Sequence, residues 1–133
     1  MDAKKALEEA KGDIKKAEEI IAAKGLLKAA SKSERAVGSG RVFSYIHQTG
    51  RIGAMVELAC ETDFVAKTVE FEALCKEIAM QAASMNPADI EELMHQEYIR
   101  DGSKTIEDLL KALIAKTGEN MKIVRFVRFG LGE

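Results

Sequence analysis

The sequence has no tryptophan, a single proline and only two cysteines in 133 residues. Two cysteines in a chain of this size do not form a disulfide framework, so a reducing compartment is expected. No apolar run approaches the roughly 18 residues that a membrane-spanning helix needs. The first residues, MDAKKALEEAKGD, are charged throughout and lack the apolar centre of a signal peptide. Together these absences predict a cytoplasmic protein that makes no membrane contact.

An excess of either charge is also absent, because 20 basic residues stand against 22 acidic ones and the net charge is −2. A protein that attracts nucleic acid or an anionic membrane through its overall field usually carries a clear positive excess. What the sequence does have is 47% hydrophobic and 32% charged residues, the balance of an ordinary globular protein. A chain of this length can build one core with a small appendage.

The pattern divides the chain into three parts. Residues 1–25 contain two short helical patterns, each with one narrow apolar stripe. Isolated helices below about 12–15 residues are marginal, so this helical hairpin needs a further packing partner. Residues 26–40 have the composition of a linker, with a short helical pattern and a flexible GSG near the end. We expect residues 41–133 to form the main domain.

The main domain begins with two strand patterns, residues 41–48 and 51–60, joined through Gly50. So short a connection predicts an antiparallel hairpin. A helix is predicted after Thr68, because apolar residues recur there at steps of three and four. The stripe expected to be buried consists of Phe71, Leu74, Cys75, Ile78, Ala79 and Ala82.

The second half of the domain alternates between helix and strand signals. Asn86-Pro87 is predicted to end the long helix and to open another, with the Asn as its N-cap. Residues 96–99 indicate a short edge strand before a turn at Asp101-Gly102. Thr105, with an Asp three residues later, resembles a capping box that opens a helix ending at Gly118.

The last segment, MKIVRFVRF, is rich in β-branched and aromatic residues and predicts a final strand. A hairpin, helices and a returning strand favour an α+β fold: an antiparallel sheet with helices packed on one face, preceded by the short helical hairpin.

Residues suited to catalysis are few and scattered. His47 and His95 are the only histidines, and no motif surrounds either of them. Cys60 and Cys75 fall on predicted core faces, where cysteine behaves as a small apolar residue. The chain has no CxxC or HxxxH spacing and no glycine-rich phosphate loop. We therefore expect no enzyme, no cofactor and no metal site.

The final strand offers an alternative function, because it interleaves basic and aromatic residues as nucleic-acid-binding strands do. Strict alternation would place Phe126 on one face with Lys122, Val124 and Arg128. Arg125 would then interrupt the other face, which holds Ile123, Val127 and Phe129. The charge balance lacks the footprint of a nucleic-acid-binding protein, and the arginines can equally meet a protein partner. A nucleic-acid-binding α+β module is the alternative interpretation.

The stretch ELACETDFVAK, residues 57–67, places Phe64 at a polar corner after Thr62 and Asp63. One interpretation is a capped turn, since short oxygen side chains accept free backbone N–H groups, with Phe64 and Val65 folded back onto the next helix. The other is a binding anchor, an aromatic ring on a loop held by a rigid hairpin. The pattern alone favours the capped turn and names no partner.

The residues ETDFVAK after an apolar strand resemble the signature of the bacterial elongation factor Ts family, the nucleotide exchange factors of elongation factor Tu. Four further segments agree in order: MDAKKALEEAKGDIKKA, RIGAMVEL, SKTIEDLL and GENMKIVRFVRFGLG. The resemblance covers nearly the whole chain. It implies that Phe64 is a wedge entering the nucleotide domain of elongation factor Tu near its magnesium site. Asp63 would contact the partner, and Thr62 and Val65 would set the corner.

The resemblance further implies that the partner is bound in its GDP-bound and nucleotide-free forms, without direct contact to nucleic acid. Family members with a short core suggest a homodimer. Three departures from the family pattern stand out. Met1 falls after the leucine-arginine and threonine-glycine motif, so the ubiquitin-associated-like domain is expected to lack its first helix. Ala59 stands where Asn is usual, and the region between Met85 and Gln96 is shorter, which implies a shortened core.

Overall fold

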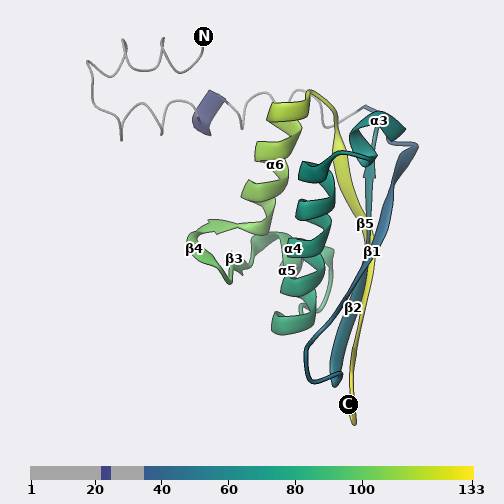
Figure 1. Ribbon diagram of the computed structural model, residues 1–133. Coiled ribbons are helices and arrows are strands. Elements are labelled where there is room, and N and C mark those ends of the chain that lie inside the picture. Colours follow the sequence, from purple (N-terminus) through teal and green to yellow (C-terminus); the bar gives the residue numbers. More distant parts are fainter. Residues whose placement is uncertain (1–21, 25–34) are drawn as a thin grey trace.

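The computed structural model describes residues 22–24 and 35–133 (Figure 1). Residues 22–24 are helical. Apart from these three residues, the helical hairpin predicted for residues 1–25 lies outside the described part of the chain. The same holds for the short helix predicted between residues 26 and 31, so both remain predictions.

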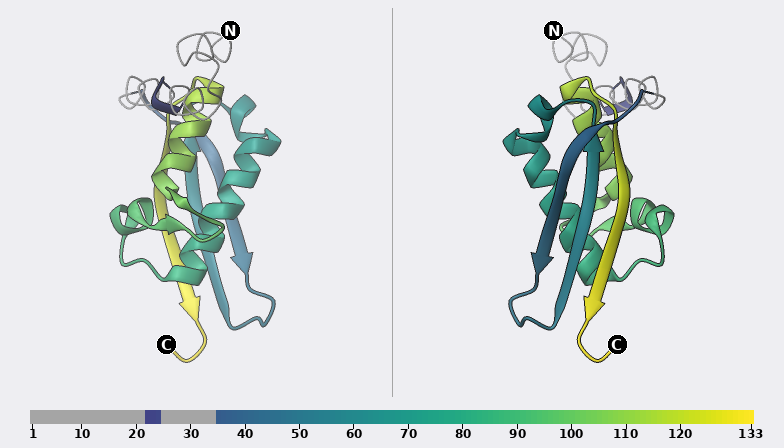
Figure 2. Two further views of the ribbon diagram at one scale, coloured as in Figure 1. Left: turned by 90° about the vertical axis from the view of Figure 1, so that its left-hand side faces the viewer. Right: turned by 90° about the vertical axis from the view of Figure 1, so that its right-hand side faces the viewer.

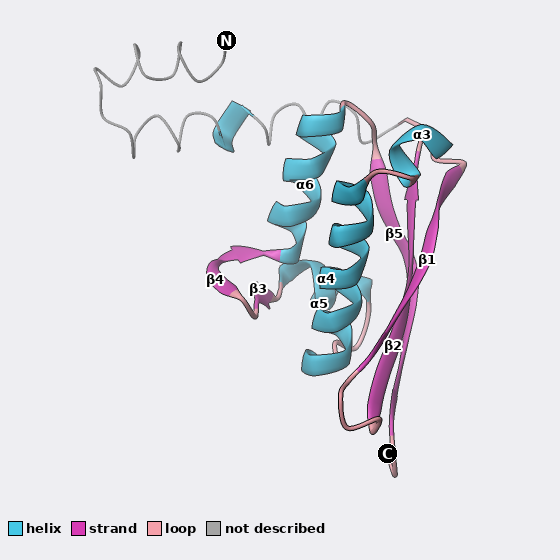
Figure 3. Cartoon of the chain, viewed as in Figure 1, coloured by secondary structure: helices cyan, strands magenta, loops and turns pink. Residues whose placement is uncertain are grey.

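The core domain has a mixed order of strands and helices (Figure 3). The long helix, the later helix and the final strand form where the sequence indicates them. The hairpin also forms, but its first strand runs from Ser39 to Ile46, so it begins inside the segment predicted as a linker and ends before residue 48. The elements are β1 (Ser39–Ile46), β2 (Ile52–Cys60), α3 (Asp63–Ala66), α4 (Val69–Met85), α5 (Ile90–His95), β3 (Glu97–Tyr98), β4 (Asp101–Thr105), α6 (Ile106–Thr117) and β5 (Met121–Gly130).

The main sheet has three strands in the order β1-β2-β5, and both pairs are antiparallel. The helices α4 and α6 cover one face of this sheet, while the other face carries no helix among the described residues (Figures 1 and 2). The predicted α+β class is therefore confirmed. The sheet runs the length of the domain, with α3 at one end and the C-terminus at the other (Figure 1).

The core lies between α4, α6 and the inner face of β2. Every residue of the stripe predicted for α4 is buried. The stripe packs against alternate residues of β2 and against α6, which supply Ala54, Val56, Leu58, Cys60, Ile106, Leu110, Leu113 and Ile114. Alternation along β2 thus sends one set of side chains to the helices, as its period of two predicts.

The helix α6 confirms its predicted ends. The Thr105 hydroxyl accepts a hydrogen bond from the Asp108 N–H at 3.1 Å, and the Asp108 carboxylate accepts one from the Thr105 N–H at 2.9 Å. This reciprocal pair is a capping box. The helix stops at Gly118, whose φ of 79° lies in the left-handed region that glycine adopts without strain.

The strict alternation predicted for the final strand is wrong. The pairing of β5 with β2 shifts between Glu57 and Leu58, so Glu57 pairs with Arg125 whereas Leu58 pairs with Ile123. Because of this bulge, the β5 residues on its two sides no longer alternate in step, and a given parity points to opposite faces of the sheet before and after it. Ile123 is buried and Phe126 packs against the core, although they have opposite parity.

The predicted role of Asn86 as an N-cap is also wrong. Asn86 ends α4 with φ 48°, and its N–H donates to the Ala82 carbonyl, so it is a C-cap in the left-handed conformation. Asparagine tolerates that conformation better than most residues, and the proline after it cannot continue the helix. The N-cap of α5 is Asp89, whose side chain accepts from the Glu92 N–H at 2.8 Å.

The strand predicted at residues 96–99 forms, but it does not border the main sheet. β3 pairs only with β4, and this two-stranded hairpin projects away from the core (Figure 1). Its turn lies at residues 99–100 and not at Asp101-Gly102, because Tyr98 pairs directly with Asp101. The buried side chain of Gln81 fixes this register: its amide donates to the Glu97 carbonyl at 3.0 Å and accepts from the Ile99 N–H at 3.1 Å.

Candidate partner-binding corner

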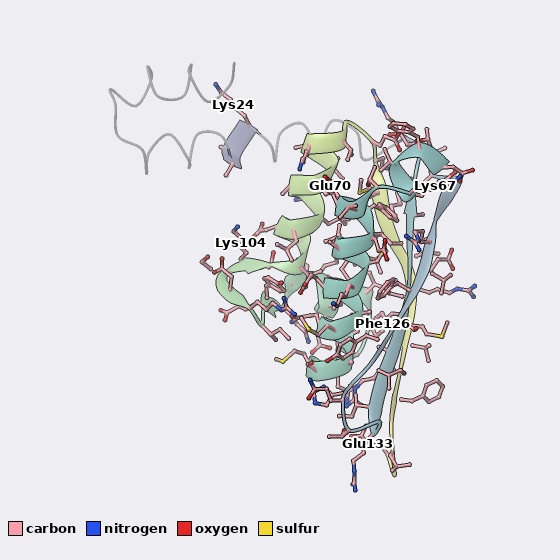
Figure 4. The ribbon with its side chains drawn as sticks, in the orientation of Figure 1. Lys24, Lys67, Glu70, Lys104, Phe126 and Glu133 are labelled. Carbon is pink, nitrogen blue, oxygen red and sulfur yellow. The ribbon has the colours of Figure 1, made fainter. Side chains whose placement is uncertain are left out.

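The corner between β2 and α4 holds the four residues that the sequence singles out. The strand β2 ends at Cys60, and the four-residue helix α3 follows at the end of the sheet (Figure 1). Lys67 and Glu70 mark the same end of the molecule, and Glu133 lies at the opposite end (Figure 4). The corner is therefore presented at one tip of an elongated domain.

Thr62 is the N-cap of α3, as the capped-turn interpretation predicts. Its hydroxyl oxygen accepts a hydrogen bond from the Val65 N–H at 3.3 Å, and its carbonyl accepts one from the Ala66 N–H at 3.2 Å. Its backbone is extended, at φ −131° and ψ 155°, which is typical of an N-cap. Asp63 occupies the first helical position, where a carboxylate interacts favourably with the helix dipole.

The two apolar residues of the corner point in opposite directions. Val65 is 6% exposed and belongs to the hydrophobic core, whereas the Phe64 side chain is 84% exposed. The prediction that both residues fold back is therefore right for Val65 and wrong for Phe64. Residues that follow one another on a helix lie about 100° apart around its axis, so burying Val65 turns Phe64 outward.

A carboxylate from a distant part of the sequence holds the cap. Glu119 lies between α6 and β5, and its Oε1 accepts a hydrogen bond from the Thr62 N–H at 3.0 Å. Its Oε2 accepts a second one from the Thr62 hydroxyl at 2.7 Å. Both oxygens of one carboxylate thus bind the residue that caps α3.

A second carboxylate, that of Glu61, connects the same two segments. The Glu61 carboxylate accepts a hydrogen bond from the Asn120 N–H, and it lies 3.7 Å from the Arg35 guanidinium. The Asn120 side-chain amide donates to the Arg35 carbonyl at 2.6 Å, and the Arg35 guanidinium donates to the Gly118 carbonyl. Residues 118–120 are therefore connected both to the corner, through Glu61 and Thr62, and to Arg35.

Sequence reasoning missed Arg35, Glu61, Glu119 and Asn120. The only local signal is that two polar residues stand directly between the helix stop at Gly118 and the apolar start of β5. Asn120 is 2% exposed, and a buried amide side chain requires hydrogen-bond partners. Nothing in the sequence indicates which segment supplies them.

The Cys60 thiol lies beneath the corner but is not a candidate nucleophile. Its S–H donates to the Thr62 carbonyl at 3.1 Å, and its side chain is fully buried. Burial raises the pKa of the Cys60 thiol, and the nearby carboxylates of Glu119 and Asp63 raise it further. A thiol of this kind supports packing, because reactive cysteines need a lowered pKa and access to solvent.

The remaining candidates lie away from the corner. The His47 ring is 3.1 Å from the Tyr45 hydroxyl, and the His95 ring binds the Glu91 carbonyl in its own helix. Across residues 22–24 and 35–133, no three or more His, Cys, Asp or Glu side chains are placed to hold a metal ion. In the same part of the chain, no helix is both long and apolar enough to cross a membrane.

The aromatic and basic residues of β5 do not form one stacking surface. Phe126 packs against the core on the helix side, while Phe129 is exposed on the opposite face. Arg125 pairs with Glu57 at 2.7 Å, and the Arg128 guanidinium donates to the Ala83 carbonyl at 2.9 Å. The described geometry therefore gives no support to the alternative interpretation as a nucleic-acid-binding strand.

Comparison with known proteins decides the family. Residues 61–132 match the family model described as Elongation factor TS. The chain belongs to the elongation factor Ts family. Curated relatives named Elongation factor Ts agree with this assignment. The protein from Leptospira biflexa is 42% identical, over 99% of this chain and 89% of the relative. Those from Thermoanaerobacter sp. (strain X514) and Anaeromyxobacter dehalogenans are 43% and 42% identical, over 100% of this chain and 87% and 81% of the relatives.

Membership of the elongation factor Ts family confirms the resemblance and places the chain in translation elongation. The family model covers the whole corner, from Glu61 through the helices to β5. The alignment with the Leptospira biflexa relative extends over 177 positions, which exceeds the 133 residues of this chain. Because the alignment takes in 99% of this chain, the extra positions fall between its residues, in agreement with a shortened core.

Proposed function

We propose that this chain is a guanine-nucleotide exchange factor for elongation factor Tu, and that its corner, Thr62 to Val65, inserts near the partner's nucleotide and magnesium site. The exposure of Phe64 carries this proposal. A phenylalanine side chain that is 84% exposed forgoes about 1.5–3 kcal/mol of burial free energy. An aromatic anchor on a rigid support is a common centre of protein–protein recognition.

The exchange requires no covalent chemistry. When the wedge displaces groups around the magnesium ion and the phosphates, the partner binds nucleotide more weakly, and reciprocity requires nucleotide to weaken the binding of the factor by the same amount. GDP then leaves, GTP enters, and the factor is released. Burying one ring yields about 1.5–3 kcal/mol and a coupling free energy is typically about 1–3 kcal/mol, so the ring supplies part of the acceleration and further contacts must supply the rest. Asp63, exposed beside Phe64, is proposed to contact the partner directly.

The proposed experiment measures release of fluorescent GDP from purified elongation factor Tu in a stopped-flow instrument. The wild-type chain is expected to accelerate release, and Phe64→Ala is expected to slow the accelerated rate by about tenfold to a hundredfold. Ile99→Ala is the matched control, because Ile99 is also a large exposed apolar residue but lies in the projecting hairpin. A wild-type chain without effect would refute the exchange function. An undiminished rate in Phe64→Ala would refute only the wedge.

A homodimer is the second part of the proposal, and the face of the sheet without helices supports it (Figure 2). We call this surface the outer sheet face; its exposed apolar residues are Val42, Ile46, Met55, Val127 and Phe129. Glu57 and Arg125 form an ion pair next to them. A two-fold arrangement of two copies can set each arginine against the other copy's glutamate, so the face is complementary to itself. Sedimentation velocity tests this: Val127→Asp should convert a dimer to a monomer, and a monomeric wild-type chain would refute it.

A further inference from the structure

The strongest unassigned feature is the double hydrogen bond between Glu119 and Thr62. Both oxygens of the Glu119 carboxylate are used, and both bind the same residue, which lies 57 positions earlier in the sequence. Hydrogen bonds to a charged acceptor are stronger than neutral ones, and two from one carboxylate fix direction as well as distance. The contact therefore restrains the orientation of Thr62 more than a single bond would.

The bond to Glu119 also determines how Thr62 caps its helix. A threonine hydroxyl has one hydrogen to donate, and here it donates to Glu119 Oε2 at 2.7 Å. The oxygen lone pairs are then left to accept, and one of them receives the Val65 N–H at 3.3 Å. A hydroxyl that turned to donate elsewhere would rotate its lone pairs as well. Glu119 thus holds the cap in the rotation that starts α3.

Phe64 is placed between two fixed points. Thr62 is held by Glu119, and Val65 is held by its burial in the core. A helix of four residues has no stability of its own, because the first turn costs more conformational entropy than its hydrogen bonds return. The direction of the exposed Phe64 ring therefore depends on both supports, and one of them comes from a different part of the chain.

We propose that Glu119 is a positioning residue for nucleotide exchange: it holds the Thr62 cap so that the Phe64 ring is ordered before the partner arrives. This inference rests on the exchange function proposed above. A corner that is already ordered loses less conformational freedom on binding, which leaves more of the interaction free energy for displacing nucleotide. Without the carboxylate, the ring would sample more directions and the partner would have to order it.

Removing Glu119 alone should leave the loop in place. Residues 118–120 are also tied by Glu61, which accepts from the Asn120 N–H, and by Arg35, which contacts Gly118 and Asn120. The helix before the loop and the strand after it are fixed by the core. Glu119→Ala is therefore expected to fold and to change chiefly the freedom of the corner.

The test is a double-mutant cycle of GDP release from elongation factor Tu, with the full chain as wild type, Glu119→Ala, Phe64→Ala and the combined variant. We expect Glu119→Ala to slow the accelerated release by about three- to tenfold when Phe64 is present. In the Phe64→Ala background the same change should alter the rate by less than about twofold. Glu119→Gln keeps one acceptor, for the Thr62 N–H, but its amide NH2 cannot accept the Thr62 hydroxyl proton, so it should recover only part of the wild-type rate.

Glu77→Ala is the matched control. The Glu77 carboxylate also joins two segments, because it accepts from the Tyr98 hydroxyl at 2.6 Å and pairs with Arg100 at 3.3 Å. It lies in the middle of α4, on the side that faces the projecting hairpin, and not at the corner. The Glu77→Ala variant should therefore accelerate GDP release from elongation factor Tu as much as the wild-type chain does, although it loses a comparable set of hydrogen bonds and ion pairs.

Two results would overturn the inference. One is a wild-type rate in Glu119→Ala, and the other is an equal slowing by Glu119→Ala with and without Phe64, since a residue that acts through the ring cannot act when the ring is absent.

The proposed exchange function is tested separately by the wild-type rate. If the wild-type chain did not accelerate GDP release, hydrogen exchange of the Thr62 amide would still test the hydrogen bonds between Glu119 and Thr62. It should be at least about tenfold faster in Glu119→Ala than in wild type, and equal rates would refute the clamp itself.

Discussion

Two phenylalanines seven residues apart differ fully in burial: the Phe64 side chain is 84% exposed, and the Phe71 side chain is fully buried. Each lies in the first turn of a helix that begins at a threonine. The Thr62 hydroxyl accepts from the Val65 N–H, and the Thr68 hydroxyl accepts from the Phe71 N–H. The two helices thus start with the same local geometry, in which the hydroxyl of the N-cap threonine accepts a hydrogen bond from the N–H three residues later.

The two rings differ in burial because they occupy helical positions one residue apart, counted from the start of each helix. Phe71 is the third helical residue of α4, equivalent to Val65 in α3, and both are buried. Phe64 is the second helical residue of α3, and its equivalent in α4 is the exposed Glu70. The corner therefore places an aromatic ring where the geometry of a capped helix normally presents a polar side chain to water.

The two caps also differ in what receives the threonine proton. The Thr68 hydroxyl donates to the Val65 carbonyl at 2.8 Å, three residues earlier, whereas the Thr62 hydroxyl donates to Glu119 from a distant loop. The start of α4 is thus stabilised by its own neighbours, and the start of α3 depends on a contact across the fold. A corner of this kind can be ordered without being part of the core.

The largest expected difference is in stability. Phe71→Ala removes a fully buried ring from between α4 and the sheet and should lower the free energy of unfolding by about 3–5 kcal/mol. Phe64→Ala removes an exposed ring and should change it by no more than about 0.5 kcal/mol. Urea unfolding followed by circular dichroism measures both. A loss above about 1 kcal/mol in Phe64→Ala would mean that the ring packs against the protein in solution.

Local patterns in the sequence predict much of the fold. The apolar stripe from Phe71 to Ala82, the capping box at Thr105 and the stop at Gly118 depend on residues within four positions of each other, and all three form as expected. The cap at Thr62 belongs to the same group. Capping and helical periodicity are short-range effects, so one sequence is enough to indicate them.

Apart from the N-cap role predicted for Asn86, which is a local error, the incorrect or missed predictions share a different cause. The turn of the small hairpin is set by Gln81, and the faces of β5 are reversed by a bulge opposite Glu57. The clamp on the corner comes from Glu119. In each case, contacts between residues far apart in the sequence decide the outcome, and propensity cannot show them. The outward direction of Phe64 follows from the burial of Val65, which is also a property of the assembled core.

The two caps provide a second, smaller comparison. Thr68→Ala removes the cap of a seventeen-residue core helix and should lower the free energy of unfolding by about 1 kcal/mol. Thr62→Ala should cost less than about half of that, since α3 can open locally while the core stays folded. Urea unfolding compares both with Thr68→Ser and Thr62→Ser, which keep the hydroxyl and should stay near wild type. A larger loss from Thr62→Ala would show that the corner unfolds together with the core.

The smallest expected effect concerns the rates at which two buried thiols react. Cys60 lies under the corner and Cys75 lies in α4, and both side chains are fully buried. Burial raises the pKa of Cys75 to about 12, so the thiol stays protonated in the folded chain. An acid whose pKa is raised by folding stabilises the fold below its ordinary pKa of 9.0, and that contribution is lost as the pH rises toward 12.

At pH 8, therefore, neither thiol should react with Ellman's reagent without an opening of the structure, and the size of the opening should decide the order. Exposing Cys60 requires displacement of a four-residue helix and its cap, whereas exposing Cys75 requires the seventeen-residue α4 to leave the sheet. Local openings cost less free energy than global ones, so Cys60 should react first.

Single variants Cys60→Ala and Cys75→Ala separate the two rates in the folded protein, and both thiols should react at once in urea. Equal rates without urea would mean that the corner opens only with the core, and the contrast between Phe64 and Phe71 would then be one of exposure alone.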